Sequence, residues 1–401
     1  MLVEHLFCCC QAGAERALKA EVDARAKGLR LAFSRPGFVT FKLPEPQPFG
    51  RLPIPRLVFA RASGASLGKV SGGDRLSDLA TKVWANPQVA ELTRDSAPLR
   101  LHVWQRDGDR PGENGFEPGV TALSREAFDA VASAAPPGAL STDDSQKSGR
   151  QSGLALDVIM VEPTEWWVGA HAIATRSDRW PGGVPPLSLP EHAVSRAYLK
   201  MREALAWSRT PAVKGDVWIE LGCAPGGASQ ALLDAGMRVL GVDPAEVDPA
   251  VVASDHFRWL QMRSADVKKR EFASARWLAA DINAAPNYTL DAVESVVTST
   301  GSAIRGLLLT LKLPEWSLAG PTLLDEYIAR VRSWGYRDIR LRQLAFNRRE
   351  VCLAALRSRG QRRMRRGRTR RGGWRGSSPG DASRGQDPPR DDAAPCRRPP
   401  E

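Results

Sequence analysis

The stretch that decides the fold is Asp216-Val-Trp-Ile-Glu-Leu-Gly-Cys-Ala-Pro-Gly-Gly-Ala-Ser-Gln-Ala-Leu-Leu233. Its apolar first part predicts a strand ending at Leu221, and its last part predicts a helix from near Ala228 to near Gly236. Glycines 222, 226 and 227 lie between them, where a turn without side chains lets the backbone approach a ligand closely. The next strand, Met237-Arg-Val-Leu-Gly-Val-Asp243, ends in a carboxylate. This unit predicts a ligand laid across the ends of parallel strands.

The residues in and after the turn indicate which kind of ligand it binds. Asp243 comes about 20 residues after the turn, where a carboxylate can accept hydrogen bonds from both hydroxyls of a ribose. A phosphate-binding P-loop requires Gly-Lys-Ser/Thr, and the dinucleotide fingerprint requires G-x-G-x-x-G, but here Gly222 is followed by Cys-Ala-Pro. The sequence therefore favours an adenosyl ligand over a purely structural glycine-rich turn.

The rest of the chain divides around this unit. Strands and helices alternate over about 185–357, which predicts an α/β fold with a mostly parallel sheet covered by helices. Before it, residues 1–43 predict strand, helix and strand, and prolines between 44 and 55 suggest a linker or an edge segment. A second block predicts a helix over 74–85 and strands over 57–62, 99–104, 154–161 and 165–171. Residues 358–401 have almost no apolar content and predict a disordered Arg-rich tail.

Composition limits the classes of protein. Of the 401 residues, 42% are hydrophobic and 25% are charged, and no apolar run approaches the roughly 18–20 residues that cross a bilayer. The N-terminal residues do not resemble a signal peptide, so we expect a cytoplasmic protein. Cys8, Cys9 and Cys10 are consecutive, the other three cysteines are isolated, and no C-x-x-C pair occurs. We expect reduced thiols and no metal site.

The net charge of +12 belongs mostly to the tail. Residues 357–401 contain 14 arginines against 5 acidic residues, so the preceding part is close to neutral. The charge therefore does not by itself predict a basic face on the folded part. Ten arginines and no acid over 357–375 are typical of an RNA-binding arm, but an unstructured extension without a function explains them as well.

The glycine turn resembles a known cofactor motif. Gly222-Cys-Ala-Pro-Gly-Gly227 is similar to that of the FtsJ-like RNA ribose methyltransferases, which use a Lys-Asp-Lys-Glu tetrad drawn from four segments. Four segments of this chain match in the expected order, and the last residue of each supplies one member of the tetrad. The segments are Ser195-Arg-Ala-Tyr-Leu-Lys200, Arg276-Trp-Leu-Ala-Ala-Asp281, Gly306-Leu-Leu-Leu-Thr-Leu-Lys312 and Asn347-Arg-Arg-Glu350. Lys312 closes an almost entirely apolar strand, which a role in surface charge explains poorly.

A narrower resemblance covers most of residues 1–357. Leu311-Lys-Leu-Pro314, Arg349-Glu-Val351 and Cys10-Gln-Ala-Gly-Ala-Glu-Arg-Ala-Leu18 resemble the ribosomal RNA large subunit 2′-O-methyltransferase M family. This resemblance implies a ferredoxin-like domain at 1–56, a THUMP-like RNA-binding domain at 57–178 and a Rossmann-like methyltransferase domain at 185–357. It further implies S-adenosylmethionine as the cofactor and large-subunit (23S) ribosomal RNA or its precursor as the partner, with a cytidine ribose as the target. We expect neither a membrane nor DNA as a partner.

The resemblance also implies roles for individual residues. We expect Lys312 to be the general base and Asp281 to position it. We expect Lys200 and Glu350 to position the ribose. A ribose hydroxyl is a poor acid, and a lysine can take its proton only if burial and a neighbouring cation lower the lysine's pKa. The expected cofactor-binding residues are Glu220, Gly222, Cys223, Pro225, Gly226, Gly227, Asp243, Asp266 and Asp281.

Two other classes compete with this interpretation. Base-amine methyltransferases carry Asn/Asp-Pro-Pro-Tyr/Phe where this chain has Asp281-Ile-Asn-Ala284, and base C5 methylation requires a cysteine near that strand or the next, where none is found. The alternative from a different class is a non-catalytic RNA-binding or ribosome-assembly protein that retains the methyltransferase fold. The complete tetrad argues against it.

Overall fold

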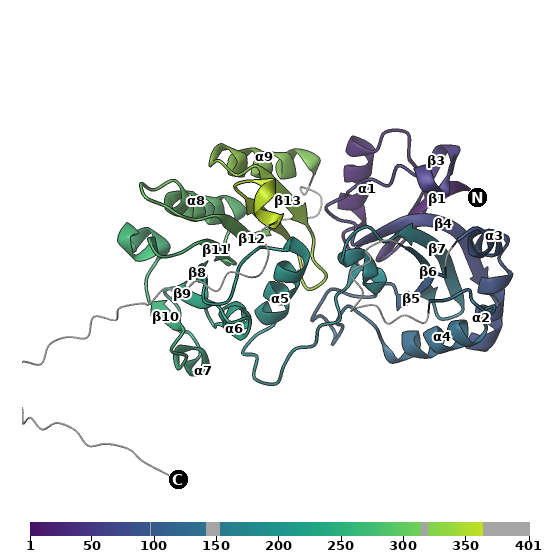
Figure 1. Cartoon of the computed structure of the whole chain (residues 1–401), viewed down its shortest axis with the longest axis horizontal. Coiled ribbons are helices and arrows are strands. Elements are labelled where there is room, and N and C mark those ends of the chain that lie inside the picture. Colours follow the sequence, from purple (N-terminus) through teal and green to yellow (C-terminus); the bar gives the residue numbers. More distant parts are fainter. Residues whose placement is uncertain (97, 142–152, 314–319, 364–401) are drawn as a thin grey trace, which may run out of the picture. The chain divides into compact units, whose positions relative to one another are not determined.

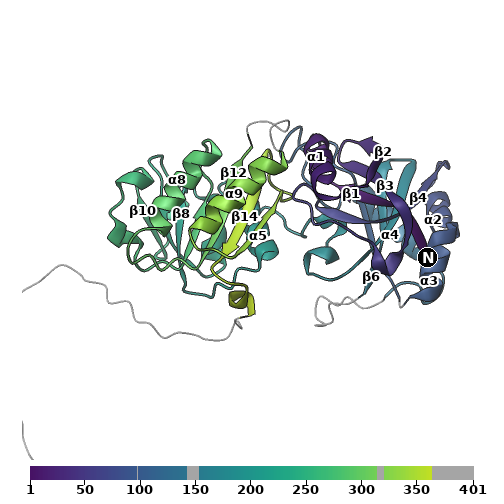
Figure 2. The ribbon, with the colours of Figure 1, turned by 90° about the horizontal axis from the view of Figure 1, so that it is seen from above.

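The computed structural model describes residues 1–96, 98–141, 153–313 and 320–363. They form two seven-stranded sheets with helices (Figures 1 and 2). The tail predicted at 358–401 lies outside the described residues except for its first six, which include the short 3-10 helix η6 (Arg359–Arg363).

The C-terminal sheet has the strand order β10-β9-β8-β11-β12-β14-β13. Its pairs are parallel except those of β14, which runs antiparallel to both of its neighbours. The α/β fold with a mostly parallel sheet, predicted from the alternation of elements, is thereby confirmed. The strands are β8 (Val217–Leu221), β9 (Arg238–Val242), β10 (Phe257–Leu260), β11 (Trp277–Ala280), β12 (Gly306–Lys312), β13 (Asp338–Arg342) and β14 (Glu350–Leu356).

Helices cover both faces of this sheet (Figure 1). Successive residues of a strand point to opposite faces, so Trp218 packs in one apolar cluster and Ile219 in another. The Trp218 cluster includes residues of α5 (Ala197–Ser208), α6 (Gly227–Asp234) and α7 (Pro249–Val252). The Ile219 cluster includes residues of α8 (Pro286–Val297) and α9 (Pro321–Ser333). The strands are therefore apolar on both sides, as buried parallel strands are.

The N-terminal sheet has the order β2-β3-β1-β4-β7-β6-β5, and only its β5–β6 pair is parallel. Leucines and valines of α2 and α3 pack in one apolar cluster with the strands. The strands are β1 (Leu2–Cys9), β2 (Arg30–Arg35), β3 (Phe38–Pro48), β4 (Ala62–Ser71), β5 (Arg100–Gln105), β6 (Leu154–Glu162) and β7 (Glu165–Ala172). The helices are α1 (Glu15–Arg25), α2 (Leu76–Ala85), α3 (Pro87–Asp95) and α4 (Ala122–Ser133).

One local prediction in this region is wrong. Residues 57–61 are not a strand, because their apolar side chains fill the core outside the sheet while Val58 and Phe59 donate their backbone N–H to the Glu21 carboxylate. The strand is β4 instead. The prolines at 44, 46 and 48 lie within β3, and this part of β3 is an edge, as one of the two predicted alternatives had it. Its pairing with β2 stops at Lys42, so beyond that point one side of β3 needs no N–H donor.

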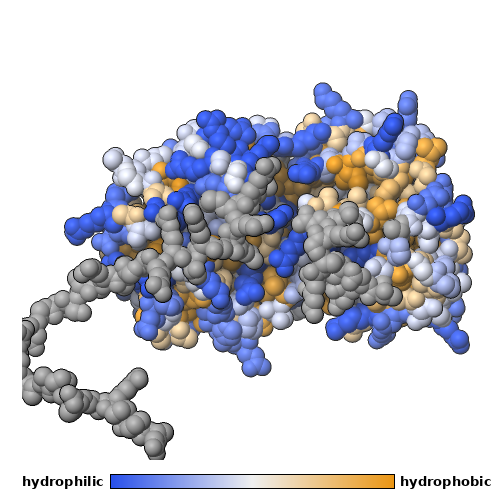
Figure 3. Space-filling model, viewed as in Figure 1, coloured by the Kyte–Doolittle hydropathy of each residue, from blue (hydrophilic) through white to orange (hydrophobic). Residues whose placement is uncertain are grey.

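The strands before and after residue 56 lie in one continuous sheet, because β1 pairs with both β3 and β4. The division into ferredoxin-like and THUMP-like domains stays a prediction. We refer to residues 1–172 as the N-terminal module. Its surface in the view of Figure 3 is mixed, with hydrophobic areas between hydrophilic residues. No helix among the described residues is both long and apolar enough to cross a membrane.

Candidate active site

The predicted site residues meet at one edge of the C-terminal sheet. Parallel strands all end at the same edge, so Gly222 after β8, Asp243 after β9, Asp281 after β11 and Lys312 at the end of β12 come together there. Glu350 begins β14, which is antiparallel, and its pairing with Lys312 therefore places it at this edge too. Lys200 reaches the edge from α5.

The turn after β8 packs backbone against backbone. Gly222 has a φ of +79°, and a Cβ there would lie 2.8 Å from the backbone oxygen of Asp281. A Cβ on Gly227 would collide with the Ser195 hydroxyl and lie 2.9 Å from the Ser195 backbone oxygen. The peptide bond between Ala224 and Pro225 is cis. The glycines are thus required by the close approach of the turn to the β11 end and to the segment before α5.

Asp243 is engaged with this turn. Its Oδ2 accepts the backbone N–H of Ala224 at 3.0 Å and its Oδ1 accepts that of Ala245 at 2.8 Å. A carboxylate offers about four acceptor positions, so two remain for the hydroxyls of a ribose. Asp266, in the 3-10 helix η4 (Ser264–Asp266) that follows β10, is exposed. Carboxylates that follow two neighbouring strands, beside a glycine-rich turn, fit a ligand such as S-adenosylmethionine that presents hydroxyl and amine donors.

Two expected cofactor residues point into the protein instead. Glu220 is 1% exposed and accepts a hydrogen bond from the Ser229 hydroxyl. Burial raises its pKa to about 8, so this carboxyl is largely protonated at neutral pH. Cys223 is buried within the Trp218 cluster, and burial raises the pKa of its thiol. Contact of either side chain with the cofactor stays a prediction.

The four tetrad residues form a ring of alternating charge. Lys200 Nζ lies 3.1 Å from Asp281 Oδ2 and 2.9 Å from Glu350 Oε2. Lys312 Nζ forms a close ion pair with Glu350 Oε1 and lies 3.7 Å from Asp281 Oδ1. The side chains of these residues are between 6% and 29% exposed, so the ring is mostly sheltered and still reachable from solvent through Lys312.

The charges of the ring shift the pKa values of Lys200 and Glu350 against the effect of burial. Burial favours the neutral amine, but the Asp281 and Glu350 carboxylates outweigh it and raise the pKa of Lys200. Burial also opposes ionisation of Glu350, yet the two lysines outweigh it and lower the pKa of Glu350. The two carboxylates therefore favour the charged form of Lys200.

The domain that carries this site matches a methyltransferase family. Residues 193–317 match the family model described as FtsJ-like methyltransferase. The prediction of a methyltransferase, with the S-adenosylmethionine cofactor of that class, is thereby confirmed.

Over most of its length the chain is similar to proteins named Ribosomal RNA large subunit methyltransferase M. The protein from Aromatoleum aromaticum is 27% identical over 328 residues, which cover 77% of this chain and 82% of that protein. The one from Azoarcus sp. is 27% identical over 376 residues, 87% of this chain and 95% of that protein. The one from Xanthomonas campestris pv. campestris is 26% identical over 377 residues, 88% of this chain and 99% of that protein. The resemblance predicted from the sequence is confirmed.

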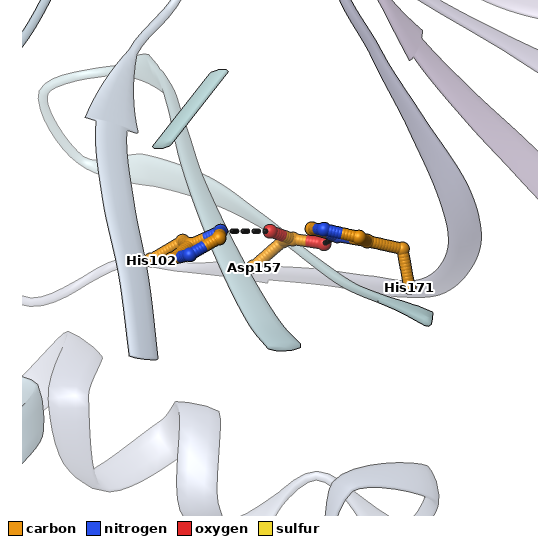
Figure 4. A group of neighbouring side chains, drawn as sticks. All are labelled: His102, Asp157 and His171. Atoms are coloured by element: carbon orange, nitrogen blue, oxygen red, sulfur yellow. Dashed lines mark hydrogen bonds and ion pairs between the residues drawn. The ribbon is translucent and has the colours of Figure 1, made fainter. Parts of the chain in front are cut away.

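A second cluster of ionisable groups lies in the N-terminal sheet, where Asp157 of β6 stands between His102 of β5 and His171 of β7 (Figure 4). These groups are of the kind and spacing that can hold a metal ion. However, the two ring nitrogens of His171 already face oxygen acceptors, Asp157 Oδ2 at 2.6 Å and the Asp178 backbone oxygen at 2.8 Å. Both nitrogens must therefore carry a proton, which makes His171 a buried cation paired with Asp157.

Sequence reasoning missed this cluster and also the groups that hold Glu350. The two histidines and Asp157 come from three strands and share no spacing in the sequence. Asn347 donates its side-chain N–H to Glu350 Oε2 at 3.1 Å and is fully buried. Its position three residues before Glu350 in the matched segment was visible, but a lone asparagine carries no signal for that contact.

Proposed function

We propose that this protein transfers a methyl group from S-adenosylmethionine to a ribose 2′-oxygen of large-subunit ribosomal RNA, with a cytidine as the target nucleotide. The observation that carries the proposal is the alternating Lys-Asp-Lys-Glu ring beside the glycine turn. The names of the relatives support ribosomal RNA as the substrate. The cytidine comes from the resemblance described above.

Methyl transfer to the ribose requires a group that removes the proton of the 2′-hydroxyl, which is a poor acid. S-adenosylmethionine, when bound, supplies a methyl group on a positively charged sulfur. Lys312 is the most exposed member of the ring, with 29% of its side chain accessible. In this proposal its ammonium first releases a proton to solvent, and the neutral amine then takes the 2′-hydroxyl proton. Lys200 is held between Asp281 and Glu350 and stays protonated, so it serves to hold the two carboxylates and to orient the ribose.

The cofactor would be held by residues of the glycine turn and by the acids at the neighbouring strand ends. Gly222, Gly226 and Gly227 shape the turn whose backbone lies beside it, Asp243 accepts from its ribose hydroxyls, and Asp266 accepts from its adenine amine. In this proposal the N-terminal module binds the RNA, and the methyltransferase domain carries out the chemistry.

The test is methyl transfer by the full-length protein to unmodified large-subunit ribosomal RNA, using cofactor with a labelled methyl group. Nuclease digestion and mass spectrometry of the product separate ribose from base methylation. We expect the label on the ribose of a single cytidine. Label on a base would overturn the 2′-O assignment, and RNA binding without any transfer would favour the non-catalytic assembly protein.

A further inference from the structure

The carboxylate of Glu350 is held by more than the two lysines. Asn347 Nδ2 donates to Glu350 Oε2 at 3.1 Å, and Asn347 Oδ1 accepts the backbone N–H of Leu344 at 3.0 Å. Only one orientation of the amide satisfies both contacts, since the oxygen must face the N–H donor. Asn347 is fully buried, so no water competes for this donor. The Glu350 carboxylate therefore receives three donors from fixed directions.

Asn347 lies in residues 343–349, the segment that joins β13 to β14, and α5 holds this segment from one side. Glu203 of α5 is buried, and its carboxylate accepts the backbone N–H groups of Ala345 at 2.9 Å and Phe346 at 3.0 Å. Glu203 follows Lys200 by three residues, which places both on one side of the helix. The same helix thus supplies one catalytic lysine and secures the segment that supplies the catalytic glutamate.

The N-terminal module holds the 343–349 segment from the other side. Gln11, between β1 and α1, is fully buried, and its Nε2 donates to the Asn347 backbone oxygen at 2.5 Å. Its Oε1 accepts from Gln343 Nε2 at 2.9 Å, and the Gln343 backbone N–H donates to the Val58 backbone oxygen at 2.8 Å. Arg348 adds a contact from the same segment to the Pro111 backbone oxygen at 2.9 Å.

These contacts matter because Glu350 pairs with both lysines. If its carboxylate rotates or moves, Lys312 loses its close partner and its direction toward the substrate. A small displacement of a group that must accept a proton in one geometry lowers the rate without weakening substrate binding. Burial increases the effect, because no solvent takes the place of a lost donor to a buried carboxylate.

We propose that Asn347 is a positioning residue for Glu350 and that Gln11 of the N-terminal module positions Asn347. The N-terminal module is then part of the construction of the catalytic centre as well as a holder of RNA. This inference rests on the proposed function for its choice of reaction, and it concerns the turnover rate rather than the site of methylation.

The first experiment compares Asn347→Ala and Asn347→Asp with the wild-type full chain. We expect kcat to fall about tenfold or more in both variants, while KM for RNA and Kd for S-adenosylhomocysteine stay within about twofold. Asn347→Asp keeps the shape of the side chain and the contact to Leu344, but it adds a negative charge beside Glu350. That charge stabilises the protonated lysines, so the ascending limb of the kcat–pH profile moves to higher pH. Asn347→Ala adds no charge, so a shift of the profile in that variant reports a change in how Glu350 meets the lysines.

The second experiment compares Gln11→Glu with Gln88→Ala. Gln11→Glu preserves the shape and removes the N–H that Asn347 accepts. Gln88 also donates to a backbone oxygen of the N-terminal module, that of Leu2 at 3.2 Å, but the contact is exposed and belongs to α3. We expect Gln11→Glu to lower kcat and Gln88→Ala to leave it unchanged. The Gln11→Glu/Asn347→Ala double variant should have nearly the kcat of Asn347→Ala alone, because both residues act through Glu350.

Wild-type kcat and an unshifted pH profile in the folded Asn347→Asp protein would overturn the role of Asn347. An effect of Gln11→Glu confined to KM for RNA, or fully additive with Asn347→Ala, would overturn the role of Gln11. Failure of the proposed function looks different: the wild type would place its methyl group on a base, and the same kcat comparisons on that reaction would still decide the positioning role.

Discussion

At the scale of single residues, the site balances two lysines against two carboxylates in a space that is mostly closed to water. Each cation touches both anions or lies within 4 Å of them, so no member can be removed without leaving a partner unbalanced. Burial disfavours each of these charges, and the oppositely charged partners offset that cost. We therefore expect the ring to fix the orientation of its side chains more than it adds to stability.

The base is tested at Lys312. In the proposed mechanism Lys312→Ala removes the proton acceptor, so the single-turnover rate should fall about 10²–10⁴-fold. Cofactor affinity should stay within a few-fold, because Lys312 faces the ring and the accepting ribose. Lys312→Arg keeps the positive charge but cannot release its proton at usable pH. A proton-accepting role predicts no rescue by arginine, whereas partial rescue would show that the charge alone is used.

The cofactor assignment is tested at Asp243. Asp243→Ala removes the two acceptors expected for the ribose hydroxyls and also the contacts that hold Ala224 and Ala245. Each hydrogen bond to a charged group is worth about 1.5–3 kcal/mol, so S-adenosylhomocysteine should bind at least roughly tenfold more weakly in calorimetry. Asp266→Ala tests the adenine contact and should weaken binding less, because Asp266 is exposed. Unchanged affinity in a folded Asp243→Ala protein would contradict the assignment.

The buried histidine predicts a pH dependence of stability. Burial favours neutral His171, but Asp157 and the Asp178 backbone oxygen outweigh it and raise the pKa of His171 to about 9. A raised pKa stabilises the protonated folded state fully below the unfolded value of about 6.5, and this stability is lost as pH rises through 9. The free energy of unfolding attributable to His171 should fall by about 1.4 kcal/mol per pH unit over that range.

Urea unfolding of the wild type and of the His171→Gln/Asp157→Asn double variant, between pH 6 and pH 9.5, measures this contribution. The double variant removes both charges and avoids leaving Asp157 buried without its cation. His102 also lies beside Asp157, so the difference between the two pH slopes belongs to the cluster of His102, Asp157 and His171. Parallel slopes would show that His171 is not charged in the folded protein.

At the scale of elements, strand direction assembles the site. Four of the parallel strands bring residues at or directly after their ends to one edge, and antiparallel β14 brings its first residue there. The start of α6 must approach the segment before α5 for Lys200 to reach the ring, and Gly227 permits that approach by having no side chain.

Gly227→Ala tests this packing. Its Cβ would meet the Ser195 hydroxyl and backbone, and the backbone cannot move without displacing α5 and Lys200. We expect a loss of about 1–3 kcal/mol in the free energy of unfolding and a fall in methyl transfer. Gly50→Ala is the matched control, since nothing lies within 4 Å of its added Cβ. Equal stability and activity of the two variants would disprove the close approach.

At the scale of the whole molecule, the methyltransferase domain and the N-terminal module share one apolar cluster. It contains Leu18 and Val22 of α1 together with Leu324 and Tyr327 of α9. The polar contacts of Gln11 and Val58 with the 343–349 segment lie beside it. The two sheets are therefore expected to unfold together rather than as independent domains.

Leu18→Ala tests the shared cluster. Leu18 is fully buried, and the change should cost about 2–5 kcal/mol in the free energy of unfolding. Calorimetry should show one transition at a lower temperature, still raised by S-adenosylhomocysteine. Leu31→Ala, at a side chain that is 54% exposed, should leave the transition nearly unchanged. A separate early transition that does not respond to the cofactor product would show that the module unfolds alone.

The α/β class and the glycine turn follow from the sequence alone, and the sequence also predicted four charged residues that the fold brings together. These features are local. The strand, the turn and the helix follow one another in the sequence, and the ends of strands place side chains such as those of Asp281 and Lys312. It did not locate β4, because the apolar run at 57–61 has the composition of a strand but packs outside the sheet.

Only the tertiary structure decided how the site is held. Gln11 and Asn347 are 336 positions apart in the chain, and neither carries a motif. Their contact depends on how two sheets pack, and that packing is set by the summed burial of many apolar residues rather than by any short pattern. The raised pKa of Lys200 also depends on the folded structure. Burial and two carboxylates from distant strands act on this one amine, and their net effect exists only in the folded chain.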